Sequence, residues 1–299
     1  MEEIVKLESI TQFNSQRGQA TLHPLVSVLE QSKSKKIQAH RYLSEVYIIF
    51  LKDVKCEEMK YGRSHYDYQE ETLIFVAPGQ VFGFNLPEEI LVQPSGWALV
   101  FHPDFIRGTS LNQRIKDYGF FGYDVNEALH ISERERQIVL ECFQKIKEEL
   151  EQGIDKHSKT LIISNIELFL NYCTRFFDRQ FITRDNLNKD ILVRFEHLLN
   201  NYFQSEKPQT LGLPSVGYLA EKLHLSANYF GDLVKKETGK NPQEYIHEKV
   251  ITLAKERIFD QRKSISEIAY EMGFKYPQHF TRLFKQRVGI SPNEYRLLN

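Results

Sequence analysis

The hydrophobic positions change their period along the chain, and the first pattern predicts strands. Between residues 40 and 105, short runs rich in Val, Ile, Phe and Tyr alternate with polar segments. Such runs are typical of β-strands. Pro78 and Gly79 suit the central positions of a type II turn between two of the runs. We expect strands over residues 45–51, 72–77, 80–84, 90–92 and 96–101, forming an antiparallel sandwich or a small barrel.

After Phe105 the hydrophobic spacing becomes three and four residues, which predicts helices. Ser132 and Glu135 have the spacing of a capping box, and apolar residues follow on one face from Ile138 to Ile146. A second helix is expected over residues 158–177. The two helices could pack onto the strands, or they could pair with their copies in a second subunit.

A polar segment is predicted to separate two domains. Residues 182–189 have no apolar period and read as a linker, and a chain of 299 residues is long enough for about two domains. We therefore expect an α+β protein. Its N-terminal domain covers residues 1–181, with a barrel over about 20–105 and helices over about 132–180, and an all-α domain covers 190–299.

A helix-turn-helix pattern occurs twice in the C-terminal domain. Ser215 begins the first copy, and Ser264, 49 positions later, begins the second. After one inserted residue at the turn the offset becomes 50 positions. The matched positions are Leu219, Ala220, Leu223, Leu225, Phe230, Leu233, Lys235, Gly239, Pro242, Glu244 and Tyr245, which recur as Ile268, Ala269, Met272, Phe274, Phe280, Leu283, Lys285, Gly289, Pro292, Glu294 and Tyr295. A duplicated two-helix unit suits the geometry of duplex DNA.

Local signals place two short helices in each copy. Ser215 and Ser264 can cap the first helices, and Gly239 and Gly289 can end the second helices in a left-handed conformation. The apolar positions of each copy are predicted to form the core between its helices. A long helix that starts at Pro242 can hold both copies in a fixed relation, so that their second helices enter major-groove segments about 34 Å apart.

Polar positions on the second helix of each copy are the candidate DNA contacts. Asn and Gln can pair with adenine and Arg with guanine through two hydrogen bonds, and Lys can contact phosphate. The candidates are Asn228, Tyr229, Gly231, Asp232 and Lys235 in the first copy and Tyr276, Gln278, His279, Thr281, Arg282 and Lys285 in the second. The alternative is that each is only part of a solvated helix face. Because Gly231 has no side chain and Asp232 repels phosphate, the second copy is expected to be at least as discriminating as the first.

Charge and composition permit this interpretation without establishing it. The net charge is −1, but residues 187–299 hold 17 Lys and Arg against 13 Asp and Glu, a net of +4. No apolar run approaches the roughly 18 residues of a membrane span, and the N-terminus does not resemble a signal peptide, so we expect a cytoplasmic protein. Cys56, Cys142 and Cys173 lack metal-ligand spacing and are predicted to be buried, reduced thiols.

The run from Ile268 to Arg296 resembles the signature of the AraC/XylS transcriptional regulators. It has Ile-Ala, Gly-Phe, Phe280, Phe-Lys, Gly289, Pro292 and Tyr-Arg at the family's spacing, and the resemblance extends back to about Ile191. It implies a DNA-binding domain of about seven helices. It also implies that Asn228, Gly231 and Asp232, and Gln278, His279 and Arg282, occupy base-facing positions, although Gly231 and Asp232 depart from the longer or basic residues common there.

The N-terminal part is similar to the cupin-like sensor barrels of these regulators, through APGQVFGF and GWALVFHPDF. The resemblance implies that the barrel binds a small effector or dimerises through the helices over 132–180, and that activation, with RNA polymerase as a partner, is commoner than repression. We expect no cofactor. Five aromatic residues are candidates for an effector pocket, although most such residues should fill the core. They are Tyr47, Phe75, Phe82, Phe84 and Trp97.

A cupin-type metalloenzyme, or an effector-binding protein with an appended helix-turn-helix domain, is the competing interpretation. His40, His65 and His102 all lie in the strand region. However, no His-x-His pair supplies two imidazoles from one strand, and no thiol lies in a basic cluster that would activate it. We therefore predict a regulator that is not an enzyme and has no metal site.

Overall fold

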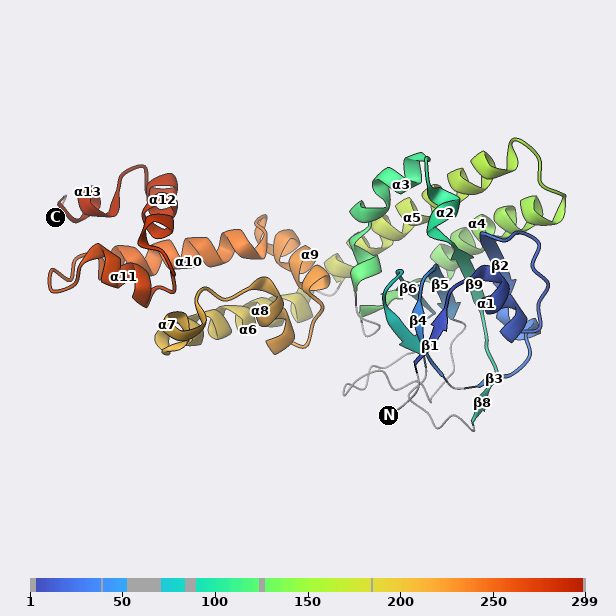
Figure 1. Cartoon of the computed structure of the whole chain (residues 1–299), viewed down its shortest axis with the longest axis horizontal. Helices are drawn as coiled ribbons and strands as arrows, with labels where there is room; N and C mark the ends of the chain where they lie inside the picture. Colours follow the sequence, from blue (N-terminus) through green and yellow to red (C-terminus); the bar gives the residue numbers. More distant parts are fainter. Residues whose placement is uncertain are drawn as a thin grey trace. The chain divides into compact units, whose positions relative to one another are not determined.

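The computed structural model of the chain describes residues 4–38, 40–52, 71–83, 90–123, 127–183 and 185–297. These residues form two compact units, Met1–Thr183 and Arg184–Asn299 (Figure 1). The first unit contains strands and helices, and the second unit is helical. The fold is therefore an α+β arrangement with a helical C-terminal region.

The strands of the first unit belong to three sheets. One sheet has the order β1-β4-β7, the largest has the order β10-β6-β5-β9-β2, and β3 pairs with β8. Pairing is antiparallel except between β1 and β4, which are parallel. The strands are β1 (Ile4–Leu7), β2 (Val26–Glu30), β3 (Ile37–Gln38), β4 (Arg41–Ser44), β5 (Tyr47–Lys52), β6 (Thr72–Val76), β7 (Val81–Gly83), β8 (Leu91–Val92), β9 (Trp97–Phe101) and β10 (Leu129–His130).

All five predicted strands are present, as β5 to β9, with ends shifted by one or two residues. The predicted turn is also present. Gly79 has a φ of 87°, and the amide of Gln80 donates to the carbonyl of Ala77 at 3.2 Å. A closed barrel is not confirmed, because the strands in the described ranges divide into three sheets. The sequence patterns did not indicate β1, β2, β3, β4 and β10.

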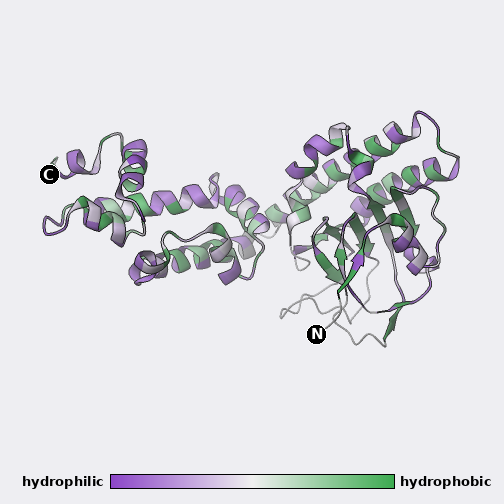
Figure 2. Ribbon diagram, in the orientation of Figure 1, coloured by the Kyte–Doolittle hydropathy of each residue, from purple (hydrophilic) through white to green (hydrophobic). Residues whose placement is uncertain are grey.

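The largest sheet is covered by apolar side chains on both faces. The register pairs Tyr47 with Phe101 and Leu51 with Trp97, so the odd-numbered residues of β5 share one face with these partners. On the opposite face Ile48, Val76 and Val100 belong to a cluster with Leu7, Ile10, Phe13 and Tyr42. Because both faces are buried, the strands are largely hydrophobic, as Figure 2 shows.

Helices α4 (Glu133–Glu151) and α5 (Ser158–Thr183) pack against each other and against this sheet. The ring of Phe143 on α4 lies 5.1 Å from that of Phe169 on α5, which in turn contacts Phe75 on β6. Ser132 and Glu135 form the predicted capping box. The sequence left two arrangements open for these helices, packing onto the strands or pairing with their copies in a second subunit. In the structure they pack onto the strands.

Short helices complete the first unit. They are α1 (Ile10–Gln16), α2 (Pro103–Ile106), α3 (Ser110–Arg114) and the 3₁₀ turns η1 (Gln31–Lys33), η2 (Ile115–Asp117) and η3 (Gly119–Gly122). Helix α1 buries Ile10 and Phe13 in the apolar cluster that also contains Ile48, Val76 and Val100. The turn η3 places Phe120 and Phe121 against Phe75 of β6. These aromatic contacts fill the space between the sheet and α5.

The second unit contains eight helices within residues 185–297, where about seven were expected. They are α6 (Asp185–Gln204), α7 (Lys207–Leu211), α8 (Val216–Lys222), α9 (Ala227–Thr238), α10 (Pro242–Arg257), α11 (Ile265–Glu271), α12 (Pro277–Val288) and α13 (Pro292–Leu297).

The boundary between the two units lies between Thr183 and Arg184, within the predicted linker over residues 182–189, and the described residues of that segment are helical. Helix α5 continues to Thr183 and α6 begins at Asp185. Near the start of α6, Asn188 is buried (1% exposed) and its side-chain amide donates to Glu237 at 3.2 Å.

Candidate nucleic-acid interface

The first helix-turn-helix unit consists of α8 and α9, and its local structure follows the predicted signals. The hydroxyl of Ser215 accepts from the amide of Tyr218 at 3.1 Å, and Ser226 accepts from the amide of Tyr229 at 3.2 Å. Gly239 ends α9 with a φ of 74°. The five predicted core positions are all buried, namely Leu219, Ala220, Leu223, Phe230 and Leu233. Packing between the two short helices therefore fixes α9.

The second helix-turn-helix unit consists of α11 and α12 and repeats this arrangement. Ser264 and Glu267 form the predicted capping box, and Gly289 ends α12 with a φ of 93°. The predicted core positions Ile268, Ala269, Met272 and Phe280 are fully buried. Leu283 differs from the prediction, because it is only half-buried, and Phe284 is the fully buried residue of that turn.

The two turns use different residues for the same left-handed backbone. In the first unit His224 has a φ of 60°, and in the second unit Gly273 has a φ of 91°. A β-carbon on Gly273 would lie 2.8 Å from the carbonyl carbon of Gly212, in the loop after α7. Backbone from the two halves of the domain therefore meets directly at Gly273.

Helix α10 connects the two units and contacts both α9 and α12 (Figure 1). The helix starts at Pro242 as predicted, and its apolar residues Ile246, Val250, Ala254 and Ile258 are fully buried. At its start, the hydroxyl of Tyr245 donates to Glu196 on α6. The long helix therefore packs on α6 as well as on both helix-turn-helix units.

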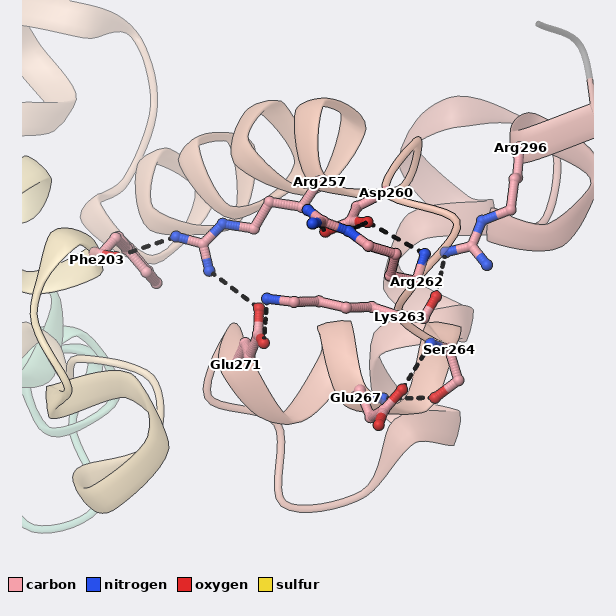
Figure 3. A network of polar contacts seen from close by, with 9 residues as sticks. All are labelled: Phe203, Arg257, Asp260, Arg262, Lys263, Ser264, Glu267, Glu271 and Arg296. Carbon is pink, nitrogen blue, oxygen red and sulfur yellow. Dashed lines mark hydrogen bonds and ion pairs between the residues drawn. The ribbon is translucent and has the colours of Figure 1, made fainter.

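A polar network connects the C-terminal end of α10 to the second helix-turn-helix unit (Figure 3). Glu271 on α11 pairs with Lys263 at 2.5 Å and with Arg257 at 3.8 Å. From α13, Arg296 donates to the carbonyls of Ile258 at 2.6 Å and Lys263 at 3.0 Å. These contacts fix the position of α11, on which α12 packs.

Helix α12 presents an exposed polar face. Gln278, Arg282 and Lys285 are exposed, and at about 100° per residue they lie within roughly 60° of one another around the helix axis. The side chains of Gln278 and Arg282 make no hydrogen bond or ion pair with the described residues. His279 is also exposed and Thr281 is half-buried. The side chains on this face are therefore available to a partner.

The N-terminus of α12 is also open. Tyr276, which is 48% exposed, occupies the N-cap position, and no side chain caps the helix there. Its ring lies 5.5 Å from that of His279. The amide of Gln278 has no hydrogen-bond partner in the described chain. A free first-turn amide at a helix N-terminus is suited to donate a hydrogen bond to a phosphate oxygen.

The corresponding face of α9 has a different character. Asn228, Asp232 and Lys235 are exposed at the equivalent positions, and Gly231 is half-buried. Tyr229 does not fit the prediction of an exposed contact, because it is 5% exposed. Its side chain is therefore buried in the domain, which the polar pattern of the helix did not reveal.

Charge separates the two second helices. Helix α12 contains Arg282, Lys285 and Arg287 and no acidic residue, whereas the two lysines of α9 are balanced by Asp232 and Glu237. Phosphate attraction depends on such local charge. The second helix-turn-helix unit therefore offers the more favourable surface to a polyanion.

The predicted aromatic pocket residues do not meet in one site. Tyr47, Phe75 and Trp97 lie on the face of the large sheet that α4 and α5 cover, where Lys147 of α4 lies 5.6 Å from the Trp97 ring. Phe82 lies on the other side, against Tyr42. Phe84 lies outside the described residues. Since strand faces cannot be assigned from a single sequence, the prediction combined residues from two sides of the sheet.

The thiol prediction is confirmed for two cysteines. Cys142 and Cys173 are buried and unpaired, and burial raises the pKa of Cys142 to about 11 and that of Cys173 well above its ordinary value. Cys56 and His65 lie outside the described residues. In the described ranges, no group of three or more His, Cys, Asp or Glu side chains could hold a metal ion. None of the helices described there is long and apolar enough to cross a membrane.

Two helix-turn-helix units joined by one long helix define a DNA-binding domain of the double helix-turn-helix class. Comparison with known proteins agrees, because residues 219–297 match a family described as a helix-turn-helix domain. The transposon Tn10 TetD protein of Escherichia coli is 34% identical over 143 residues, covering 48% of this chain and 91% of that protein. The chain belongs to the AraC/XylS family of transcriptional regulators, which are DNA-binding proteins.

Other relatives differ in how much of them the chain matches. The probable transcriptional regulator LumQ of Photobacterium leiognathi is 24% identical over 230 residues, covering 76% of this chain and 83% of that protein. A crystal structure of a transcriptional regulator with an AraC-type DNA-binding domain from Chromobacterium violaceum is 26% identical, covering 28% of this chain and 75% of that one, with a TM-score of 0.27. For the regulator YobQ of Bacillus subtilis the match covers 46% of its length.

Proposed function

We propose that this chain regulates transcription by reading DNA sequence through α12, with α9 as a second and weaker contact. The observation that carries the proposal is the exposed face of α12, on which Gln278 and Arg282 stand beside Lys285 with a positive local charge. Arg282 is suited to guanine and Gln278 to adenine, and Lys285 to phosphate.

The proposed contacts also include residues at the edges of these faces. In the second unit they are Tyr276, His279 and Thr281. In the first unit they are Asn228, Gly231, Asp232 and Lys235, while the burial of Tyr229 removes it from the set. Because α10 contacts both α9 and α12, we propose that the two second helices enter successive major-groove segments of one duplex.

Selection of bound duplexes from a random pool tests the readout. The full chain should enrich one motif, and Arg282→Ala should relax preference at one base pair at a cost of about 1–3 kcal/mol. Arg287→Ala is the matched control, because it removes the same charge from the same helix, roughly 180° away from Gln278 around the axis. The control should weaken binding to all sequences without changing the motif.

Two outcomes would contradict this assignment. If both variants weakened all duplexes alike, Arg282 would be a backbone contact. If the chain enriched no motif and its binding did not fall as salt rises, the helix-turn-helix units would not be binding phosphate.

We further propose that the N-terminal unit binds a small effector and pairs with a second copy through α4 and α5, and that the protein activates transcription together with RNA polymerase. The exposed apolar side chains of α5 support the pairing, since Leu161 and Leu168 are 48% and 42% exposed seven residues apart. A reporter gene downstream of the selected motif should rise with the wild-type chain, and analytical ultracentrifugation should detect a dimer that Leu161→Glu weakens. A fall in reporter output would indicate a repressor.

A further inference from the structure

A buried arginine in the N-terminal unit has no acidic partner. Arg17 follows α1 and is 5% exposed. Its Nε donates to Gln31 Oε1 at 3.1 Å, and one terminal nitrogen donates to the carbonyl of Phe13 at 3.1 Å. The other terminal nitrogen has no hydrogen-bond partner in the described chain, and no carboxylate there pairs with the guanidinium.

The positive charge of Arg17 is only partly compensated by its neighbours. Burial lowers the pKa of Arg17 to about 10, and the electrostatic interaction with Tyr42 opposes this shift. The guanidinium carbon lies 3.6 Å from the centre of the Phe13 ring. This cation–π contact and the hydrogen bond to the Phe13 carbonyl together compensate only part of the charge. A buried cation is normally paired with an anion, so the site has the electrostatics of a receptor for one.

The surroundings of Arg17 are aromatic. Phe13 lies 6.4 Å from Phe50, and Phe82 lies 5.9 Å from Phe50 and 5.5 Å from Tyr42, between ring centroids. Tyr42 is buried, whereas Phe50 and Phe82 keep part of their surface exposed although they pack against the core cluster. The Tyr42 hydroxyl makes no hydrogen bond within the described residues, and burial raises its pKa, so it remains a neutral donor.

We propose that Arg17 and Tyr42 bind the carboxylate of a small organic acid whose apolar body lies against Phe50 and Phe82. The inference rests on the proposal that the N-terminal unit binds an effector, and it specifies the chemical class of that effector. Because Nε and one terminal nitrogen already donate to Gln31 and Phe13, a planar carboxylate would accept from the other terminal nitrogen and from the remaining N–H of the first. The aromatic walls favour a ligand with an apolar body over a fully hydrated inorganic anion.

The test is a thermal-shift measurement on the full chain. Trp97 is the only tryptophan and lies in the N-terminal unit, so its fluorescence reports the unfolding of that unit. The probes are benzoate, phenylacetate and hexanoate, each compared with its neutral amide at equal ionic strength, and inorganic phosphate. At about 100 times the dissociation constant, at least one carboxylate should raise the midpoint by roughly 5–10 °C, and the amides should not.

Two variants locate the effect. Arg17→Gln should abolish the shift, and Tyr42→Phe should reduce the affinity about three- to tenfold, which is one hydrogen bond. Arg114→Gln is the matched control, because Arg114 also lies near an aromatic ring, 5.9 Å from Tyr118, in the same unit. It should keep the full response. If Arg17→Gln does not fold, the comparison of acids with amides on the wild-type chain still shows whether the protein binds a carboxylate.

The proposal is overturned if all three acids fail to shift the midpoint, if amides act as strongly as acids, or if Arg17→Gln keeps the response. A shift produced by phosphate alone also overturns it, in favour of an inorganic oxyanion. Duplex binding is measured in a separate experiment. A chain that does not recognise DNA can therefore still show a thermal shift with the acids, and the absence of a thermal shift does not contradict the DNA-binding proposal.

Discussion

Substituting Gly273 by alanine should destabilise the C-terminal domain more than the same change at other helix-ending glycines. Gly273 forms the turn between α11 and α12 with a φ of 91°. An added β-carbon would lie 2.8 Å from the carbonyl carbon of Gly212, 3.0 Å from its oxygen and 3.1 Å from the amide nitrogen of Leu213. All three atoms belong to the backbone, so no side-chain rotation relieves the contact.

Two effects contribute to the expected loss. A left-handed conformation costs an alanine about 1 kcal/mol, and overpacking against a fixed neighbour costs about 1–3 kcal/mol. Their sum predicts a loss of about 2–4 kcal/mol for Gly273→Ala. Gly289→Ala is the matched control, because Gly289 has a φ of 93° and open space around the β-carbon position. It should lose only the first contribution, about 1 kcal/mol.

Thermal unfolding of the full chain measures both values. Far-UV circular dichroism follows the helices of both units, and Trp97 fluorescence follows the N-terminal unit alone and should not change, so a shifted circular dichroism transition is assigned to the C-terminal domain. At about 4 °C per kcal/mol for a domain of this size, Gly273→Ala should lower the helical midpoint by roughly 8–16 °C and Gly289→Ala by roughly 4 °C. Equal shifts for the two variants would refute the close backbone contact between Gly273 and Gly212.

Three further outcomes are expected. Arg296→Ala should destabilise the C-terminal domain by about 2–4 kcal/mol in the same circular dichroism assay, because it removes two charged hydrogen bonds to backbone carbonyls; no loss would show that these bonds are replaced by water. Lys285→Ala should reduce the slope of log affinity against log salt by about 1, measured by fluorescence anisotropy of a labelled duplex, if the lysine contacts phosphate. Cys142 should resist iodoacetamide in the native protein, because a pKa of about 11 leaves about one thiolate in a thousand at pH 8, and labelling should rise as pH approaches that pKa; rapid native labelling in mass spectra would contradict this burial.

The helical repeat could be predicted closely because its signals are local. N-caps such as Ser215 and Ser264, and the left-handed glycines Gly239 and Gly289, act within one turn of chain. The core positions followed from helical spacing, since only Leu283 was less buried than expected. Tyr229 was misplaced because exposure on a short helix depends on its neighbours, which lie far apart in the sequence.

The N-terminal unit was less predictable because its order depends on pairing between distant residues. Strands with strong apolar runs, such as β5 and β9, were recognised, but β1 pairs in parallel with β4 across more than thirty residues. The face on which Phe75 lies is fixed by the register of β5 with β6 and by the position of α5. Arg17 gave no signal at all, because its burial follows from the packing of α1.

The asymmetry between the two helix-turn-helix units has a physical consequence for recognition. Helix α12 is basic and lacks a side-chain cap, so its charge and its first amide both favour phosphate, whereas α9 is neutral and already capped by Ser226. Electrostatic attraction acts at longer range than hydrogen bonding to bases. The second helix-turn-helix unit is therefore expected to contact the duplex first. Because α10 contacts both α9 and α12, we expect that encounter to bring α9 close to the groove, where the proposed contacts of Asn228 and Lys235 would form at a small further entropic cost.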